Sequence, residues 1–595
     1  MFSVANNSPR RKGDSRMASS EFPRQFVRPT DALDDWPQIE PYFQLLLAAG
    51  IDSAEKLNQW LLDWSELAAC LDEEGTGRYV RMTCQTDDAE RKQAYLDFVE
   101  NIEPRCKPLW HEIDKKFTAA ALDALPAKRF EVFTRGTRNR VELFRDENVA
   151  LEVQEAKLEQ RYQEISGAMT VEYDGRERTL QQLSVYLERT DREVREDVWN
   201  LSTQRRLADA DVLDDIFDEL FRLRHQMARN AGLPDYRAYA FKRKERFDYT
   251  PDDCLAFHEA VERTCVPLLR QLHDRRRRNL AVDTLRPWDL IVDETGRPPL
   301  RPFDSPAELT DKCRAIFTAV HPDLGEQFLD MTRRGDLDLE SRKGKAPGGY
   351  QSTFHESRRP FIFMNAVGMH RDVRTLIHEG GHAFHSLACR DEPLVQYRSA
   401  PIEFAEVASM GMEMLALDAY DVFYEGDDLA RAKRMQLEGV VNVLPWIATI
   451  DAFQHWMYTN PEHTRDQRRQ QWLALHERFG GPEDYTNHEQ ALARSWQKQL
   501  HLFEVPFYYI EYGIAQLGAL QVWRNAMKSK GHAVDAYRRA LALGGSRPLP
   551  ELFAAADIAF DFSADTLAPL MDLVQTQLDA LGDVPASNER FTITN

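Results

Sequence analysis

Apolar residues recur at spacings of three and four along most of this chain, which is the pattern of amphipathic helices. The pattern is clear from about 36 to 165, from about 179 to 280, and again from 372 to the end. Glu, Lys, Arg and Gln fill the positions between the apolar residues. We therefore expect a mainly α-helical protein.

Three segments interrupt this pattern. In the first, Asp174-Gly175 is typical of a hairpin turn between two short strands. The second, 286–306, is rich in proline and predicts a long surface connection. The third, 341–366, begins with a glycine-rich loop that leads into a strand and ends with a short apolar run, 360–365, that predicts a buried strand. A small β-sheet is therefore expected among the helices.

Size and charge narrow the class of protein. A chain of 595 residues is long enough for two or more lobes. Its net charge of −21 argues against nucleic acid or an anionic membrane as a partner. Seven scattered cysteines without a C-x-x-C pair indicate a reducing compartment, and no apolar run is long enough to span a bilayer. We expect a cytoplasmic protein, and the oligomeric state stays open.

The strongest chemical signal is His378-Glu379-Gly380-Gly381-His382, an H-E-x-x-H motif within an expected helix. Two histidines four residues apart lie on one helical face and can bind the same zinc ion. The glutamate between them can take a proton from a water molecule that zinc activates. Glycine is costly inside a helix, and this cost is tolerable where a backbone or a peptide substrate must approach closely.

A catalytic zinc ion needs a third protein ligand. His385 is too far along the helix axis from His378 to share a tetrahedral ion easily. A second expected helix, 401–415, carries Glu403, Glu406 and Glu413 near one face. Spacing alone does not choose between Glu403 and Glu406 as the ligand.

A third block, 501–523, carries His501 just ahead of a helix on which Tyr509, Tyr512 and Gln516 share a face. An aromatic stripe of this kind is usually core packing. Near a zinc site, however, tyrosine hydroxyls can stabilise an oxyanion by donating hydrogen bonds. These residues are therefore candidates for transition-state stabilisation.

The ordered blocks RKGKAPGGY, RPFIFMN, DVRTLIHEGGHAFHS, PIEFAEVASMGMEML and HLFEVPFYYIEYGIAQLGALQVW resemble the thimet oligopeptidase and oligoendopeptidase F family of zinc metallopeptidases, and most closely the oligoendopeptidase F branch. The resemblance is strong over about 340–525. It implies a mainly α, two-lobed helical zincin-type fold that encloses a deep substrate channel, with a small β-sheet near the active site. It also implies a zinc-dependent endopeptidase that hydrolyses short unfolded peptides.

The resemblance also implies roles for particular residues. The zinc ion, one per chain, would be bound by His378, His382 and Glu406, with Glu413 orienting a ligand and Glu379 as the general base. The transition-state donors would be His501, Tyr509 and Tyr512, with Tyr508 as a possible substitute. The glycine loop, Gly348-Gly349-Tyr350, resembles the edge strand along which family members bind a peptide backbone.

For the organisation of the chain we expect a disordered leader at 1–20, a helical region at 21–190 and the zinc peptidase region at 191–595, with interleaved lobes. Two other functions remain open. A carboxypeptidase or dipeptidyl carboxypeptidase on the same scaffold would need a cationic group to bind the free carboxylate of its substrate. A non-catalytic peptide- or metal-binding relative would not need the general base Glu379.

Overall fold

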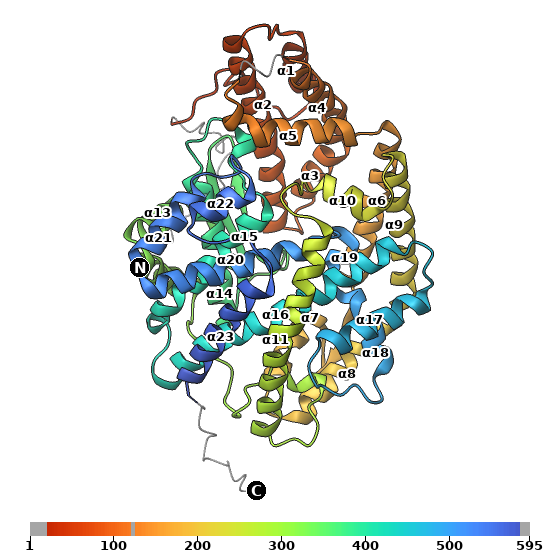
Figure 1. Ribbon diagram of the computed structural model, residues 1–595, viewed down its shortest axis with the longest axis vertical. Helices are drawn as coiled ribbons and strands as arrows, with labels where there is room; N and C mark the ends of the chain where they lie inside the picture. The colour runs from red at the N-terminus through yellow and green to blue at the C-terminus, as the bar shows by residue number, and fades with distance from the viewer. Residues whose placement is uncertain (1–20, 121–124, 583–595) are drawn as a thin grey trace, which may run out of the picture.

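The computed structural model of the protein describes residues 21–120 and 125–582, and most of these residues are helical. Figure 1 shows the N-terminal helices as one group and the remaining helices packed below it. The expected leader at 1–20 lies outside the described residues. Among the described residues, no helix is long and apolar enough to cross a membrane.

The N-terminal group follows the helical pattern predicted from about 36 to 165. It consists of α1 (Trp36–Ala48), α2 (Ala54–Cys84), α3 (Ala89–Asn101), α4 (Glu103–Thr118) and α5 (Ala127–Leu143), and α6 (Asp146–Gly167) follows it and packs against a later helix (Figure 1). Short polar side chains set several of these boundaries. Ser53 accepts a hydrogen bond from the Lys56 backbone at the start of α2, for example, and so satisfies a backbone group that the helix leaves unpaired.

The predicted hairpin is present. Strands β1 (Thr170–Tyr173) and β2 (Arg176–Thr179) pair antiparallel, and Asp174 and Gly175 between them have φ of 56° and 69°. Positive φ at both central residues matches the twist of the flanking strands. The chain continues through α7 (Leu180–Leu183), α8 (Arg192–Ala208), α9 (Ala210–Asn230), α10 (Tyr236–Arg243) and α11 (Pro251–Asn279).

The second sheet lies in the middle of the sequence. After α12 (Pro306–Val320) and α13 (Pro322–Arg334) come β3 (Leu337–Glu340), β4 (Tyr350–Phe354) and β5 (Arg359–Ala366). The strand order is β3-β5-β4, with β3 parallel and β4 antiparallel to β5, so β4 lies at an edge. The predicted strand at 360–365 is confirmed as part of β5, and the glycine loop leads into β4.

The helical pattern resumes after the sheet, as expected. It forms α14 (His370–Ala388), α15 (Ile402–Leu415), α16 (Gly426–Thr459), α17 (Arg465–Phe479), α18 (Glu489–Ala493), α19 (Leu500–Glu504), α20 (Tyr509–Lys528), α21 (Lys530–Leu541), α22 (Leu549–Ala555) and α23 (Ala564–Ala580). Asp372 is the third residue of α14. Its carboxylate accepts hydrogen bonds from the backbone of Val367 and Met369.

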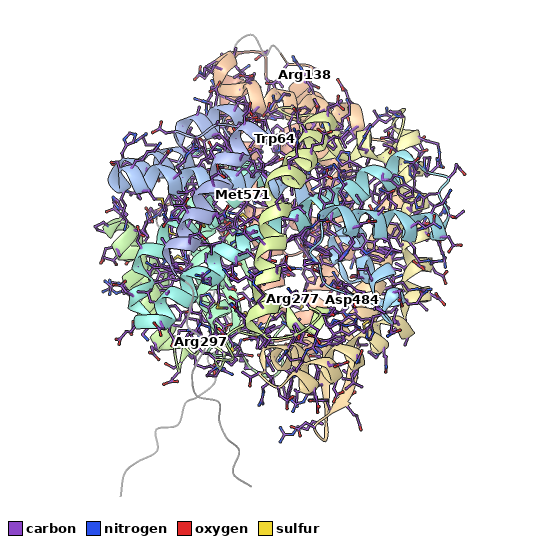
Figure 2. The ribbon with its side chains drawn as sticks, turned by 60° about the horizontal axis from the view of Figure 1, so that its bottom comes forward. Trp64, Arg138, Arg277, Arg297, Asp484 and Met571 are labelled. Atoms are coloured by element: carbon purple, nitrogen blue, oxygen red, sulfur yellow. The ribbon has the colours of Figure 1, made fainter. Side chains whose placement is uncertain are left out.

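Two separate apolar cores hold these helices together. The smaller core lies among the N-terminal helices and also includes Leu394 and Tyr397 from the second half of the chain. The larger core begins at Tyr162 and runs to Leu578. Trp64 belongs to the smaller core and Met571 to the larger one, and both are labelled in Figure 2. The chain therefore passes from the smaller core to the larger one before residue 190. The later segment with Leu394 and Tyr397 packs in the smaller core again.

Helix α15 packs between α14 and α20 at the centre of the larger core. Two glycines allow these close contacts. A β-carbon at Gly381 would lie 2.5 Å from the Ala408 carbonyl oxygen and 2.6 Å from the Ser409 α-carbon. A β-carbon at Gly518 would lie 2.7 Å from a methyl group of Val407. Both α14 and α20 therefore approach α15 closely, α14 at the backbone of α15 and α20 at one of its side chains.

Candidate active site

Two histidines and a glutamate from neighbouring helices converge at one point. The Nε2 atoms of His378 and His382 on α14 lie 3.5 Å and 3.6 Å from Oε2 of Glu406 on α15. One ligand atom from each residue lies within 4.8 Å of the others. Both histidines are partly open to solvent, whereas Glu406 is buried. This donor set and spacing fit a zinc ion with one position left for substrate or water.

Hydrogen bonds orient all three candidate ligands. His378 Nδ1 lies 2.7 Å from Oε1 of Glu413, and the His382 ring bonds to the backbone of Ala405. Ser409 donates from Oγ to Oε2 of Glu406 over 2.8 Å. Because these contacts occupy the other nitrogen of His378 and restrain the carboxylate of Glu406, the ligand atoms stay directed at the common point.

Glu413 lies at the centre of a polar network. Its Oε2 accepts from Gln436 Nε2 at 2.8 Å and from Arg374 Nη2 at 3.3 Å. Burial opposes its charge, but the hydrogen bond from His378 still lowers the pKa of Glu413 to about 2. The ionised carboxylate in turn raises the pKa of His378 to about 9 against the effect of burial. A cation at this position is thus favoured, whether it is a proton or a metal ion.

Glu379 lies between the histidines and faces the edge strand β4. Its side chain is buried and accepts a hydrogen bond from the backbone of Gln351. Burial raises the pKa of Glu379 to about 7, and the neighbouring Glu406 adds to the effect. A carboxyl group with such a pKa can both accept and release a proton near neutral pH.

The two glycines of the motif make room for the protein's own helices. Gly381 faces the backbone of α15, as described above. A β-carbon at Gly380 would lie 2.5 Å from the ring of Phe317 on α12. Of the two reasons expected for these glycines, close approach of the protein's own backbone is confirmed at Gly381, and space for a peptide is not needed to explain either glycine. They are needed because α12 and α15 pack directly against α14.

His385 and Glu403, the other residues considered as a third ligand, lie outside the cluster. His385 is buried against Phe404, with ring centroids 6.2 Å apart, and burial lowers its pKa to about 3. Glu403 Oε1 accepts a hydrogen bond from the Tyr249 hydroxyl at 2.6 Å. The structure thus places Glu406, and neither Glu403 nor His385, beside the motif histidines.

The aromatic block lies across the site from α14. His501 on α19 contacts three tyrosine rings, with centroids at 5.7 Å for Tyr508, 4.7 Å for Tyr509 and 6.1 Å for Tyr512. Burial and the charge of Lys244 lower the pKa of His501 to about 4, so the ring is neutral at neutral pH. A neutral histidine can donate a hydrogen bond without repelling a nearby metal ion.

The hydroxyls of the three tyrosines differ in their surroundings. Burial raises the pKa of Tyr508 and of Tyr512, which also bond to each other, and the charge of Glu406 raises both further. The Tyr509 hydroxyl instead accepts a hydrogen bond from Gln499 Nε2 at 2.8 Å. The charge of the ligand cluster therefore acts on the hydroxyls of Tyr508 and Tyr512. The resemblance implied Tyr509 as a donor, with Tyr508 as a possible substitute, and the choice between them stays a prediction.

The glycine loop connects the edge strand to the N-terminal helices. Gly348 has a φ of 96°, which favours glycine, and a β-carbon at Gly349 would lie 3.1 Å from Thr375 on α14. The Tyr350 ring stacks on Phe363 of β5 at 4.7 Å, and its hydroxyl bonds to Thr83 on α2 at 2.5 Å. The loop thus holds β4 between α14 and α2.

A mainly helical fold, with a small sheet beside an H-E-x-x-H helix and a glutamate from the next helix, defines the class as a helical peptidase. The family model "Peptidase family M3" matches residues 185–306 and 316–571, and the model "Peptidase M3 N-terminal domain" matches residues 32–144. The chain belongs to peptidase family M3.

Among curated proteins, the chain is similar to an oligoendopeptidase F homolog of Borreliella burgdorferi, with 24% identity over 48% of this chain and 49% of the relative. It is also similar to oligopeptidase PepF of Bacillus subtilis, with 25% identity over 47% of this chain and 42% of the relative. Each alignment therefore spans less than half the length of the curated relative.

Solved structures extend the likeness along nearly the whole chain. A structure of PZ peptidase A with an inhibitor has a TM-score of 0.86 at 26% identity and covers 91% of this chain and 97% of its own. A structure described as a putative oligoendopeptidase F also has a TM-score of 0.86, at 27% identity, and covers 95% of this chain and 99% of its own. The helical peptidase fold expected from sequence is confirmed.

Proposed function

We propose that this protein is a zinc-dependent endopeptidase that hydrolyses short unfolded peptides. The observation that carries the proposal is the position of Glu379, between the His378–His382–Glu406 cluster and the edge strand β4. A metal site, a base and a strand edge then meet at one place. Such a combination suits hydrolysis of an extended peptide better than metal storage, which needs no base.

His378, His382 and Glu406 would hold the ion. When bound, zinc would polarise the scissile carbonyl and lower the pKa of the attacking water towards neutrality. Cobalt or manganese also suits this ligand set, so the native metal is a matter for measurement.

The chain's own residues supply the proton transfers. Glu379 would take a proton from the attacking water and pass it to the leaving amine. Tyr508 and Tyr512, with His501 beside them, would donate hydrogen bonds to the oxyanion that forms on the carbonyl. We favour Tyr508 over Tyr509 in this role because the charge of Glu406 raises the pKa of Tyr508 and of Tyr512, which places these two hydroxyls near the ligand cluster.

The substrate would lie along β4. In the described sheet, β5 pairs with one side of β4 and the other side is an edge. A peptide that adds to this edge would use backbone hydrogen bonds and would therefore be bound with little regard to its sequence. Gly348, Gly349 and Tyr350 would set the start of this strand. A channel between the lobes would exclude folded proteins.

We further propose that the protein acts in the cytoplasm, on peptides and without nucleic acid or membrane partners. All seven cysteines are free, in agreement with a reducing compartment.

The metal and the base can be tested separately. Purified protein should contain about one zinc ion per chain at this site, and chelation should abolish cleavage of internally quenched peptides. Glu379→Gln should keep the metal and lose turnover. Normal cleavage by this variant would show that Glu379 is not the base.

A matched pair of variants on α15 tests the third ligand. Glu406→Gln should weaken metal binding, whereas Glu403→Gln, the same change at a buried position one turn away, should not. Equal metal affinity in the two variants would contradict the assignment of Glu406.

Mapping the products from peptides of graded length distinguishes the remaining activities. Internal cleavage, with or without a free C-terminal carboxylate, is the expected result. Loss of cleavage when the C-terminus is amidated would identify a carboxypeptidase, and no cleavage by zinc-loaded protein would identify a non-catalytic relative.

A further inference from the structure

A second group of metal-ligating side chains lies between α11 and α16, apart from the residues of the candidate active site. It consists of Cys254 on α11 and of Asp451 and His455 on α16. One ligand atom from each residue lies within 4.8 Å of the others. Asp451 and His455 are four residues apart, so they share one face of α16, and α11 packs against that helix.

This group is buried and incompletely hydrogen-bonded. Cys254 and Asp451 are 0% exposed and His455 is 4% exposed. Among the described residues, Oδ1 of Asp451 has no hydrogen-bond partner, and Nε2 of His455 has only the long contact of 3.3 Å to the other oxygen of Asp451. A buried polar atom without a partner destabilises the folded protein. An unpaired carboxylate oxygen beside a buried thiol and a weakly paired histidine nitrogen therefore points to a ligand.

The charges around Asp451 also indicate that a cation binds here. Its ion-pair partners among the described residues are His258, whose Nε2 lies 2.8 Å from Oδ2, and His455, whose Nε2 lies 3.3 Å from the same oxygen. Neither partner carries a permanent charge. Arg246 also interacts electrostatically with Cys254, but Glu511 already lies 2.7 Å from the guanidinium of this arginine. The carboxylate of Asp451 thus has no permanent cation of its own.

We propose that Cys254, Asp451 and His455 bind a divalent transition-metal ion of the zinc class, with His258 orienting the aspartate. Sulfur, nitrogen and carboxylate oxygen together favour zinc over magnesium or calcium. On binding, the Cys254 thiol releases its proton to solvent. The thiolate and the carboxylate then balance the two charges of the ion, so the buried complex is neutral.

One contact would change on binding. His455 Nδ1 lies 3.5 Å from Nη1 of Arg237, at the outer limit of a hydrogen bond. An ion at Nε2 requires the proton of the ring to be at Nδ1, so this weak contact is given up.

The position of this site gives it a structural role beside the aromatic block. The His455 ring packs edge-on against Phe507, with centroids 5.4 Å apart, and the neighbouring Gln454 accepts a hydrogen bond from the Phe507 backbone at 2.6 Å. Phe507 has a φ of 62° and directly precedes Tyr508. An ion bound by His455 would therefore hold in place the turn that presents Tyr508.

Cobalt substitution tests the proposal, because a thiolate bound to Co²⁺ gives a charge-transfer band in the near ultraviolet. The His378–His382–Glu406 cluster contains no cysteine and cannot produce this band. The experiment uses the full chain carrying His378→Ala and His382→Ala, freed of metal with a chelator and titrated with Co²⁺. We expect the band to rise and saturate at about one cobalt per chain.

The matched variants are Cys254→Ser and Cys265→Ser in the same background. Both cysteines are buried on α11. The band should disappear in the first variant and remain in the second, and circular dichroism should show that both are folded. Absence of the band in the parent protein, or its persistence in the Cys254→Ser variant, would overturn the proposal. Because the signal does not depend on peptide cleavage, this outcome is independent of the proposed function.

Discussion

The contact between α14 and α15 at Gly381 predicts the effect of a single methyl group. In Gly381→Ala, the new β-carbon would lie 2.5 Å from the Ala408 carbonyl oxygen and 2.6 Å from the Ser409 α-carbon. Atoms of this kind pack at about 3.5 Å, so the helices must separate by about 1 Å. Both contacts are to backbone, so no side chain can rotate away to relieve them.

This separation would act directly on the ligand cluster. His378 and His382 lie on α14, and Glu406 lies on α15, one turn from the point of contact. A displacement of about 1 Å in a catalytic constellation can lower activity by about 100-fold. Alanine would add up to about 1 kcal/mol of helix propensity, whereas overpacking would cost about 1–3 kcal/mol, so a modest net loss of stability is expected.

The assay compares metal affinity, kcat/KM on a quenched peptide and the urea midpoint in wild-type and Gly381→Ala proteins. Gly531→Ala on α21 is the control, because a β-carbon there would meet no atom within 4 Å. The control should keep full activity and the wild-type metal affinity. Wild-type activity and metal affinity in Gly381→Ala would refute the reasoning that this helix contact sets the geometry of the site.

Two further predictions concern residues that surround the metal ligands. Glu413→Gln removes the charged acceptor 2.7 Å from His378 Nδ1 and should weaken zinc binding by about 10- to 100-fold. Competition with a chromogenic chelator measures this affinity, and an unchanged value would show that the hydrogen bond does not support the ligand. Tyr512→Phe should lower kcat by about 100- to 1,000-fold with little change in KM. Tyr509→Phe, which loses bonds to Gln499 and Trp446, should have a much smaller effect, and the reverse order would restore Tyr509 as the donor.

The sequence alone was sufficient for the secondary structure and the chemical motif. Apolar spacing of three and four predicts helices because each helix must bury one face, and the hairpin at Asp174-Gly175 follows from local turn chemistry. The pair His378 and His382 is equally local, since four residues make one turn of a helix. The resemblance to a known family then indicated Glu406, which spacing could not distinguish from Glu403.

Only the tertiary structure decided which distant groups meet. Gly381 lies at a contact between α14 and α15. Tyr508 follows a turn whose shape cannot be inferred from residue spacing, and the charge of Glu406 raises the pKa of its hydroxyl. Cys254 and Asp451 lie on helices far apart in the sequence, and neither residue belongs to a recognisable motif. Their meeting depends on how α11 packs against α16. Such packing results from the summed contacts of the whole core, and no short stretch of sequence specifies it.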